Sequence, residues 1–189
     1  MVGKAFYQQI EAVSDSLPPV ELWDPPLSGN MDCLIRRDGS WHIEGSRLEN
    51  DRMIRLFSTV LKHEDDNYFL VTPAEKWHIE VEDLPFIVVE LKITNKGRAE
   101  QLIQVRTNVG DWIMINAEHA VCASPIAGLP DRQAIPCVHI RAGLMARLNR
   151  STFLEFAELL EPALGTDQYT FISAATSFSL NLEEQKDNV

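Results

Sequence analysis

The chain has 189 residues, of which 45% are hydrophobic and 24% charged, and its formal net charge at pH 7 is −11. These values are ordinary for a globular protein with one domain or two small ones. The net negative charge excludes broad, nonspecific binding to nucleic acid or to an anionic membrane, because the overall field repels polyanions. The apolar stretches are too short to span a bilayer and the N-terminus lacks the apolar core of a signal peptide, so a cytoplasmic location is expected.

The first half of the chain contains signals for two helices and several strands. In chain order these are a helix near 6–17, an extended proline-rich segment over 18–30, a β-hairpin over 33–44, a helix over 49–62 and a strand over 68–72. Asp38-Gly39 supplies the positive-φ turn of the hairpin. Trp23 is expected to anchor the proline-rich segment on the core, and residues 63–66 are expected to form the solvated end of the second helix.

Strands dominate the second half of the chain. Trp77, Ile79 and Val81 alternate with polar residues, which is typical of a half-buried strand. Further strands are predicted over 86–93, 102–107, 112–115, 136–141 and 168–173, with a helix over 149–161. Asn149 offers N-capping chemistry to that helix. The stretch 116–135 is predicted to be a long irregular connection, and such connections are often functional.

Three short motifs recur at similar offsets along the chain. His42-Ile43 returns as His139-Ile140, Arg47-Leu48 as Arg147-Leu148, and Asp66-x-Tyr68 as Asp167-x-Tyr169. Each series has the order strand, helix, strand, so an internal duplication is predicted. Two related lobes bury a groove between them, where ligands commonly bind.

Four sequence blocks are distinctive enough to compare with a known family. They are Trp23-Asp24-Pro25-Pro26, Thr72-Pro73-x-Glu75-Lys76, Val81-Glu82-Asp83-x-Pro85-Phe86 and Arg141-x-Gly143-Leu144-x-Ala146-Arg147. These blocks resemble the bacterial family called domain of unknown function 1285. The resemblance implies a duplicated α+β core whose C-terminal half looks like a pleckstrin-homology barrel. It also implies a signalling role, with a nucleotide-like ligand where the halves meet and no assigned enzymatic activity.

Together the repeat and the resemblance predict an α+β fold. It consists of internally duplicated strand–helix–strand units with mainly antiparallel sheets, the C-terminal half resembling a pleckstrin-homology-like barrel. The expected divisions are an N-terminal helix and strap over 1–30, a first lobe over 31–84, a second lobe over 85–180 and a polar tail over 181–189.

The candidate ligand site combines the charged stretch around 72–83 with the arginine-containing stretch 132–154, which has no Asp or Glu. The expected set is Glu75, Lys76, Trp77, Asp83, Asn108, His119, Arg141, Gly143, Arg147 and Arg150. Lysine and guanidinium groups suit phosphate or carboxylate, and Gly143 lets backbone approach a ligand closely. A small anionic or nucleotide-like molecule is therefore the expected partner. The structural alternatives are a solvated strand face and arginines that pair with carboxylates elsewhere.

Other chemistries have weaker support in the sequence. His119, Cys122, Cys137 and His139 can be written as zinc ligands, and the two cysteines as a redox pair, but buried small hydrophobic cysteines are the simpler interpretation. None of the common catalytic signatures occurs. We therefore expect no catalytic residue, metal or cofactor, and a non-enzymatic ligand-binding module. The alternatives are a protein-interaction adaptor and, less favoured, a hydrolase that uses His119 beside Glu118.

Overall fold

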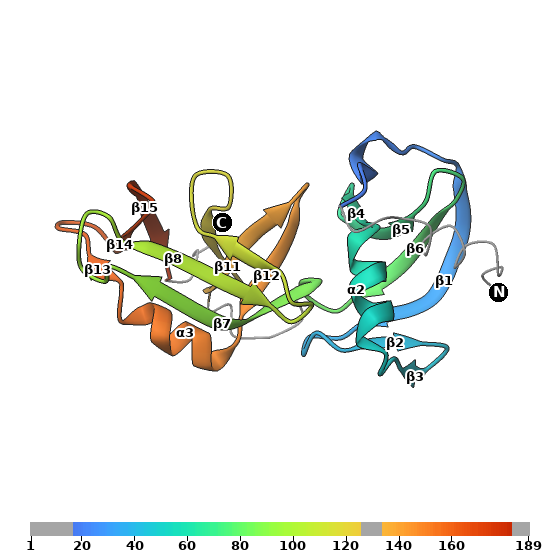
Figure 1. The fold of residues 1–189 in the computed structure, drawn as a ribbon, viewed down its shortest axis with the longest axis horizontal. Coiled ribbons are helices and arrows are strands. Elements are labelled where there is room, and N and C mark those ends of the chain that lie inside the picture. Colours follow the sequence, from blue (N-terminus) through green and yellow to red (C-terminus); the bar gives the residue numbers. More distant parts are fainter. Residues whose placement is uncertain (1–16, 126–133, 183–189) are drawn as a thin grey trace, which may run out of the picture. The chain divides into compact units, whose positions relative to one another are not determined.

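The computed structural model describes residues 17–125 and 134–182, so the helix predicted near 6–17 lies outside the described residues. The chain forms two compact units. The first contains the residues up to Pro85 together with Ala142–Leu144, and the second contains Phe86–Arg141 and the residues from Met145 onward. Each unit is built around its own six-stranded sheet (Figure 1).

The first unit begins with the 3-10 helix η1 (Val20–Leu22) and a long strand. Its remaining elements are β1 (Leu27–Ile35), β2 (Trp41–Ile43), β3 (Ser46–Arg47), α2 (Asp51–Thr59), β4 (Leu61–Glu64), β5 (Asn67–Val71) and β6 (Lys76–Val81). The sheet order is β3-β2-β1-β6-β5-β4. Helix α2 packs on one face of this sheet, where the rings of Phe57 and Trp41 lie 6.1 Å apart and both residues are fully buried.

The hairpin between β1 and β2 is confirmed, with Gly39 at φ 77° in its turn. The predicted end of the second helix is wrong. Helix α2 stops at Thr59, and Leu61 starts a strand that pairs with β5. The reason is tertiary, because Leu61 is 1% exposed and its cross-strand partner Leu70 is fully buried. Residues 65–66 form the following turn with positive φ.

The proline-rich segment docks on the first unit through Val20 more than through Trp23. Val20 in η1 is 5% exposed, whereas Trp23 is half-buried and its backbone is extended. The last part of the segment is extended as predicted, because β1 already begins at Leu27.

The described part of the second unit contains ten elements. They are β7 (Phe86–Thr94), β8 (Leu102–Thr107), β9 (Trp112–Met114), β10 (Val121–Pro125), β11 (Ala134–Arg141), β12 (Leu144–Leu148), α3 (Arg150–Ala157), β13 (Glu161–Pro162), β14 (Gln168–Ser173) and β15 (Thr176–Asn181). The six-stranded sheet has the order β10-β11-β12-β7-β8-β9, and β13-β14-β15 form a small second sheet. The large sheet curls into a half-barrel, and the Ser173 hydroxyl ties the small sheet to it by donating to the Ile115 carbonyl at 2.7 Å.

The two large sheets share one topology. If the strands of each are numbered from one to six in chain order, both have the order 3-2-1-6-5-4. In both, the first and sixth strands pair in parallel, as β1 with β6 and β7 with β12. The pairs β1–β2, β2–β3, β4–β5, β5–β6, β7–β8, β8–β9 and β10–β11 are antiparallel. The prediction of two similar halves with mainly antiparallel sheets is therefore confirmed.

Several boundaries in the second unit differ from the predictions. The stretch expected to be irregular contains strand β10, and strand β12 was missed between two predicted elements. Both strands are held by pairing with strands elsewhere in the chain, β10 with β11 and β12 with β7, which no local signal reveals. The N-cap of α3 is confirmed, because the Asn149 side chain accepts a hydrogen bond from the Thr152 backbone N–H at 2.8 Å. That helix ends at Ala157, one turn earlier than expected.

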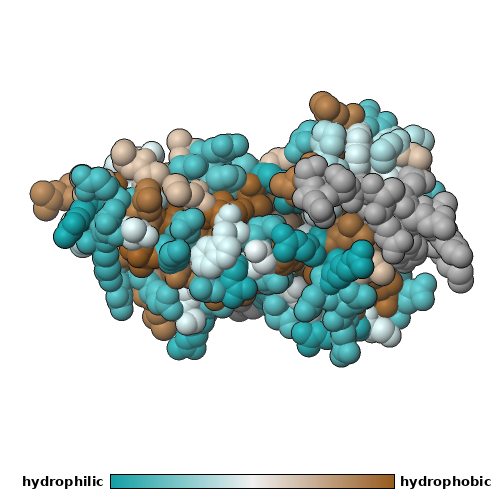
Figure 2. All heavy atoms as spheres, viewed as in Figure 1, coloured by the Kyte–Doolittle hydropathy of each residue, from teal (hydrophilic) through white to brown (hydrophobic). Residues whose placement is uncertain are grey.

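The surface of the protein carries both hydrophilic and hydrophobic residues. On the face shown in Figure 2, hydrophilic residues cover much of each unit and hydrophobic ones lie exposed between them. The most exposed large hydrophobic residues are Leu164 and Leu22, and Trp112 is also exposed. No helix in the described part of the chain has the length and hydropathy that crossing a bilayer requires.

Candidate functional site

One face of the sheet in the first unit carries a group of charged and aromatic side chains. Cross-strand register pairs Lys62 with Phe69 and Phe69 with His78, so these three side chains share a face. Lys76 and Glu64 lie two residues from His78 and Lys62 on the same strands, and the period of two puts them on that face too. We call Lys62, Glu64 and Lys76 the lysine cluster.

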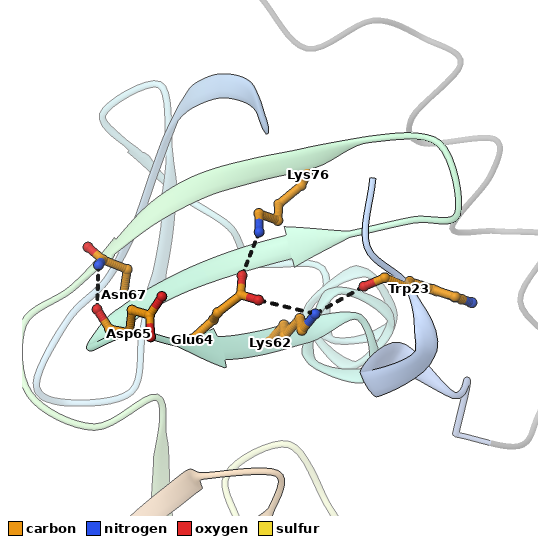
Figure 3. Close-up of polar contacts among 6 residues, drawn as sticks. All are labelled: Trp23, Lys62, Glu64, Asp65, Asn67 and Lys76. Atoms are coloured by element: carbon orange, nitrogen blue, oxygen red, sulfur yellow. Dashed lines mark hydrogen bonds and ion pairs between the residues drawn. The ribbon is translucent and has the colours of Figure 1, made fainter. Parts of the chain in front are cut away.

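The two lysines of the cluster share one carboxylate (Figure 3). The Lys76 ammonium donates to Glu64 Oε2 at 2.5 Å, and the Lys62 ammonium lies 3.6 Å from Glu64 Oε1. Lys62 also donates to the backbone carbonyl of Trp23 at 3.0 Å, which ties β4 to the proline-rich segment. The lysine side chains are each 14% exposed and that of Glu64 is 33% exposed.

The cluster has a formal net charge of +1, because it contains two ammonium groups and one carboxylate. The hydrogen bond from Lys76 holds the pKa of the Glu64 carboxyl below its usual range, and the charge of Lys62 adds to this effect. Lys76 also lies over the Phe69 ring at 4.9 Å from the centroid, and the His78 ring meets Phe69 edge-on. An ammonium has three N–H donors, so the cluster can donate to an anion while it keeps Glu64.

The other residues predicted around 72–83 do not share this face. Trp77 alternates with Lys76 along β6, and its indole N–H donates to Glu75 at 3.3 Å. Glu75 also closes a turn in which its backbone N–H bonds the Thr72 hydroxyl at 3.1 Å. Asp83 is half-buried after the end of β6. Of the four predicted residues here, only Lys76 belongs to the lysine cluster.

Most of the predicted residues of the second unit have structural contacts. The Asn108 side chain accepts a hydrogen bond from the Ile87 backbone N–H at 3.0 Å, which links the turn between β8 and β9 to β7. Arg141 lies over the buried Phe86 ring at 5.7 Å from the centroid. Arg150 is exposed at the first turn of α3. Gly143, which belongs to the first unit, adopts φ +76° in the turn between β11 and β12.

Arg147 is buried, with 4% of its surface exposed. Its guanidinium donates to the Ser124 carbonyl at 2.9 Å, the Ile135 carbonyl at 3.2 Å and the Pro125 carbonyl at 3.3 Å. The Ser124 hydroxyl accepts a weaker contact at 3.4 Å. The guanidinium therefore joins the ends of β10 and β11, a role that the sequence pattern did not suggest.

The imidazole rings of His119 and His139 each donate a hydrogen bond to a backbone carbonyl. His119 Nδ1 donates to the His139 carbonyl at 3.2 Å, and His139 Nδ1 donates to the Glu118 carbonyl at 3.0 Å. The two imidazole rings are stacked, with their centroids 6.4 Å apart. Within residues 17–125 and 134–182, no group of three or more His, Cys, Asp or Glu side chains is arranged to hold a metal ion.

Sequence reasoning missed Lys62 and Glu64. It assigned Lys62 to a helix and the acidic residues after it to that helix's solvated end. The available signal was the alternation of Leu61 and His63 with Lys62 and Glu64, which has the period of a strand. That run is only four residues long, and its helical and extended readings are equally open.

The fold defines a mostly β protein of two units with similar six-stranded sheets, and its first unit carries a compact cationic cluster. The chain belongs to the DUF1285 family. The family's N-terminal domain of unknown function matches residues 18–84, and its C-terminal domain matches residues 85–180.

Two crystal structures of family members are similar to this chain. A DUF1285 family protein from Silicibacter pomeroyi DSS-3 is 31% identical, with a TM-score of 0.84 over 98% of both chains. A DUF1285 family protein from Shewanella baltica OS155 is 27% identical, with a TM-score of 0.51 over 68% of this chain and 91% of that one. No curated protein matches the chain.

Proposed function

We propose that this protein is a non-enzymatic binding module for a small anionic, nucleotide-like molecule, and that the lysine cluster of the first unit is its anion-recognition element. The observation that carries the proposal is the sharing of one carboxylate by two largely buried ammonium groups. The cluster keeps a net positive charge within a chain whose net charge is −11. Because the net charge of the whole chain is negative, this local positive charge attracts a small anion at one place, whereas the overall field of the protein repels anions.

The neighbouring aromatic rings support a ligand that carries a planar group. Phe69 and His78 lie on the same face as Lys76, and the edge-on contact between their rings has a centroid distance of 5.6 Å. Aromatic faces accept stacking of a base or another flat ring. A ligand that carries both a phosphate and a flat ring would place the phosphate on Lys76 and the ring against Phe69 and His78. The proposal concerns the first unit alone.

A thermal-shift screen at low salt tests the proposal, with inorganic phosphate, pyrophosphate, adenosine and nucleoside mono- and diphosphates as probes. Low salt is needed because screening weakens exposed charge interactions. We expect a nucleotide to raise the melting temperature of the wild type but not of Lys76→Met. Lys92→Met on β7 is the matched control, because Lys92 is exposed in the other unit and should leave the shift intact.

Glu64→Gln gives a result of the opposite sign. Removing a carboxylate about 6 Å from the anion relieves about 1 kcal/mol of repulsion at an effective dielectric constant near 60, a gain of about fivefold in affinity. Titration calorimetry with the best probe measures it. Weaker binding by this variant, or equal binding by Lys76→Met and the wild type, would contradict an anion site at the cluster.

An adaptor function is the second candidate, and the free edge of the second unit's sheet favours it. Strand β9 is an edge strand in the described part of that sheet, and its Trp112 is 45% exposed beneath the guanidinium of Arg106. Edge strands and exposed aromatics suit the addition of an extended peptide. A partner whose purified form binds the wild type and Lys76→Met equally but not Trp112→Ala would favour the adaptor.

Further parts of the proposal concern the cell and the repeat. We infer a cytoplasmic location and a role in bacterial signalling, which fractionation of the native organism and deletion of the gene would test. For the fold, we propose that the duplicated unit is strand–helix–strand and that the second unit is related to pleckstrin-homology barrels. A helix between two strands occurs in each unit, α2 between β3 and β4 and α3 between β12 and β13, which supports the first point, although α2 follows the third strand of its large sheet and α3 follows the sixth.

A further inference from the structure

Two cysteines face each other across neighbouring strands of the second unit. The antiparallel register of β10 and β11 pairs Cys122 directly with Cys137. Their Sγ atoms lie 3.1 Å apart, and the pair is in its dithiol form. Directly opposed residues of an antiparallel pair have Cα atoms about 4.5–5.5 Å apart, which lies within the range that disulfides span. The sulfurs need to approach by about 1 Å to reach bonding distance.

The two thiols differ in their access to solvent. Cys122 is exposed on β10, an edge strand among the described residues, whereas Cys137 is 1% exposed. A reagent in solution can therefore reach Cys122, and Cys137 is reached through its partner's sulfur. This is the asymmetry of an attacking thiol and a resolving thiol.

The surroundings of the pair stabilise a thiolate on Cys122. The hydrogen bond from the Cys137 thiol, helped by the positive charge of Arg147, lowers the pKa of Cys122 to about 7. The third cysteine has the opposite character, because burial raises the pKa of Cys33 to about 12. Only the thiolate attacks a disulfide, so reactivity is concentrated at Cys122.

We propose that Cys122 and Cys137 form a thiol–disulfide exchange site whose substrate is the disulfide of a small thiol. The Cys122 thiolate bonds to one sulfur of the small disulfide and breaks its S–S bond, and the departing thiolate takes up a proton. Cys137 then loses its proton to solvent and attacks Cys122 Sγ. This second step releases another molecule of the small thiol and joins the two cysteines. The protein dithiol is oxidised by two electrons and the small disulfide is reduced by two.

The experiment uses the full chain and glutathione disulfide as the probe. The reduced protein is incubated anaerobically with the probe, and its thiols are counted after denaturation. We expect the count to fall from the three cysteines of the sequence to one. We also expect the intact mass to fall by two hydrogen atoms and a non-reducing peptide map to join Cys122 to Cys137.

Three variants assign the steps. Cys137→Ser should accumulate a stable mixed disulfide between Cys122 and one glutathione, because the resolving thiol is absent. Cys122→Ser should keep both remaining thiols, and Cys33→Ala should form the disulfide like the wild type. Thermal unfolding of each variant checks that it is folded. The thiol count of the wild type tests the proposal without depending on any variant. Retention of all three wild-type thiols, a bond that includes Cys33, or a disulfide-linked dimer as the sole product would overturn the proposal.

Discussion

The buried guanidinium of Arg147 leads to the sharpest prediction about stability. Arg147→Met keeps most of the side chain's apolar stem and removes all its donors. Three backbone carbonyls, those of Ser124, Ile135 and Pro125, then lose a charged donor. Hydrogen bonds to charged groups contribute about 1.5–3 kcal/mol each. The two shortest contacts therefore represent about 3–6 kcal/mol, and relief of the guanidinium's desolvation offsets part of that sum.

We expect a net loss of about 2–4 kcal/mol in the free energy of unfolding for Arg147→Met. Urea denaturation followed by circular dichroism measures it, with the slope compared between variants to check that the same surface unfolds. Arg147→Lys should lose about half as much free energy of unfolding, because lysine keeps the charge but can donate to fewer of the three carbonyls. Arg150→Met is the matched control at an exposed position, and we expect a change within about 0.5 kcal/mol. An Arg147→Met protein as stable as the control would refute the structural role of the guanidinium.

Three further predictions concern Asn149, Cys122 and Glu64. Asn149→Ala should cost about 1 kcal/mol of unfolding free energy in urea denaturation, because the Thr152 N–H loses its cap, and Asn149→Asp should restore it. The alkylation rate of Cys122 should rise with pH, with a midpoint at its pKa of about 7. Cys137→Ala should move this midpoint to higher pH, because it removes the hydrogen bond that contributes most to lowering the pKa. An unchanged midpoint in Cys137→Ala would contradict the hydrogen bond as the cause. The folded-state pKa of Glu64 is lowered, so its stabilising effect is present above the unfolded value of about 4.3 and is lost as pH falls through the folded value. Glu64→Gln should therefore be less stable than the wild type at pH 7 and similar to it near pH 3 by thermal unfolding, and an equal deficit at both pH values would contradict this.

Elements with strong local signals could be predicted from the sequence. The hairpin at Asp38-Gly39 and the cap at Asn149 depend on residues close together in the chain, and both are present. Strands β10 and β12 depend on partners farther away or on weak local patterns, and both were missed. The lysine cluster had the same difficulty, because its three members come from β4 and β6 and meet only across β5.

The arginines of the predicted repeat show why two similar halves do not give a correct site, because Arg47 lies on the third strand of its sheet and Arg147 on the sixth, which are not equivalent places in the shared strand order. The repeat pairs Arg47 with Arg147, yet Arg47 is exposed and Arg147 is 4% exposed. Arg47 lies on β3, which ends its sheet in the order β3-β2-β1-β6-β5-β4, so its side chain has a strand on one side only. Arg147 lies on β12 between β11 and β7, where strands on both sides surround it. A charged side chain at such a central position is costly unless backbone acceptors meet it. The carbonyls of β10 and β11 do so, and they commit Arg147 to holding those strands together.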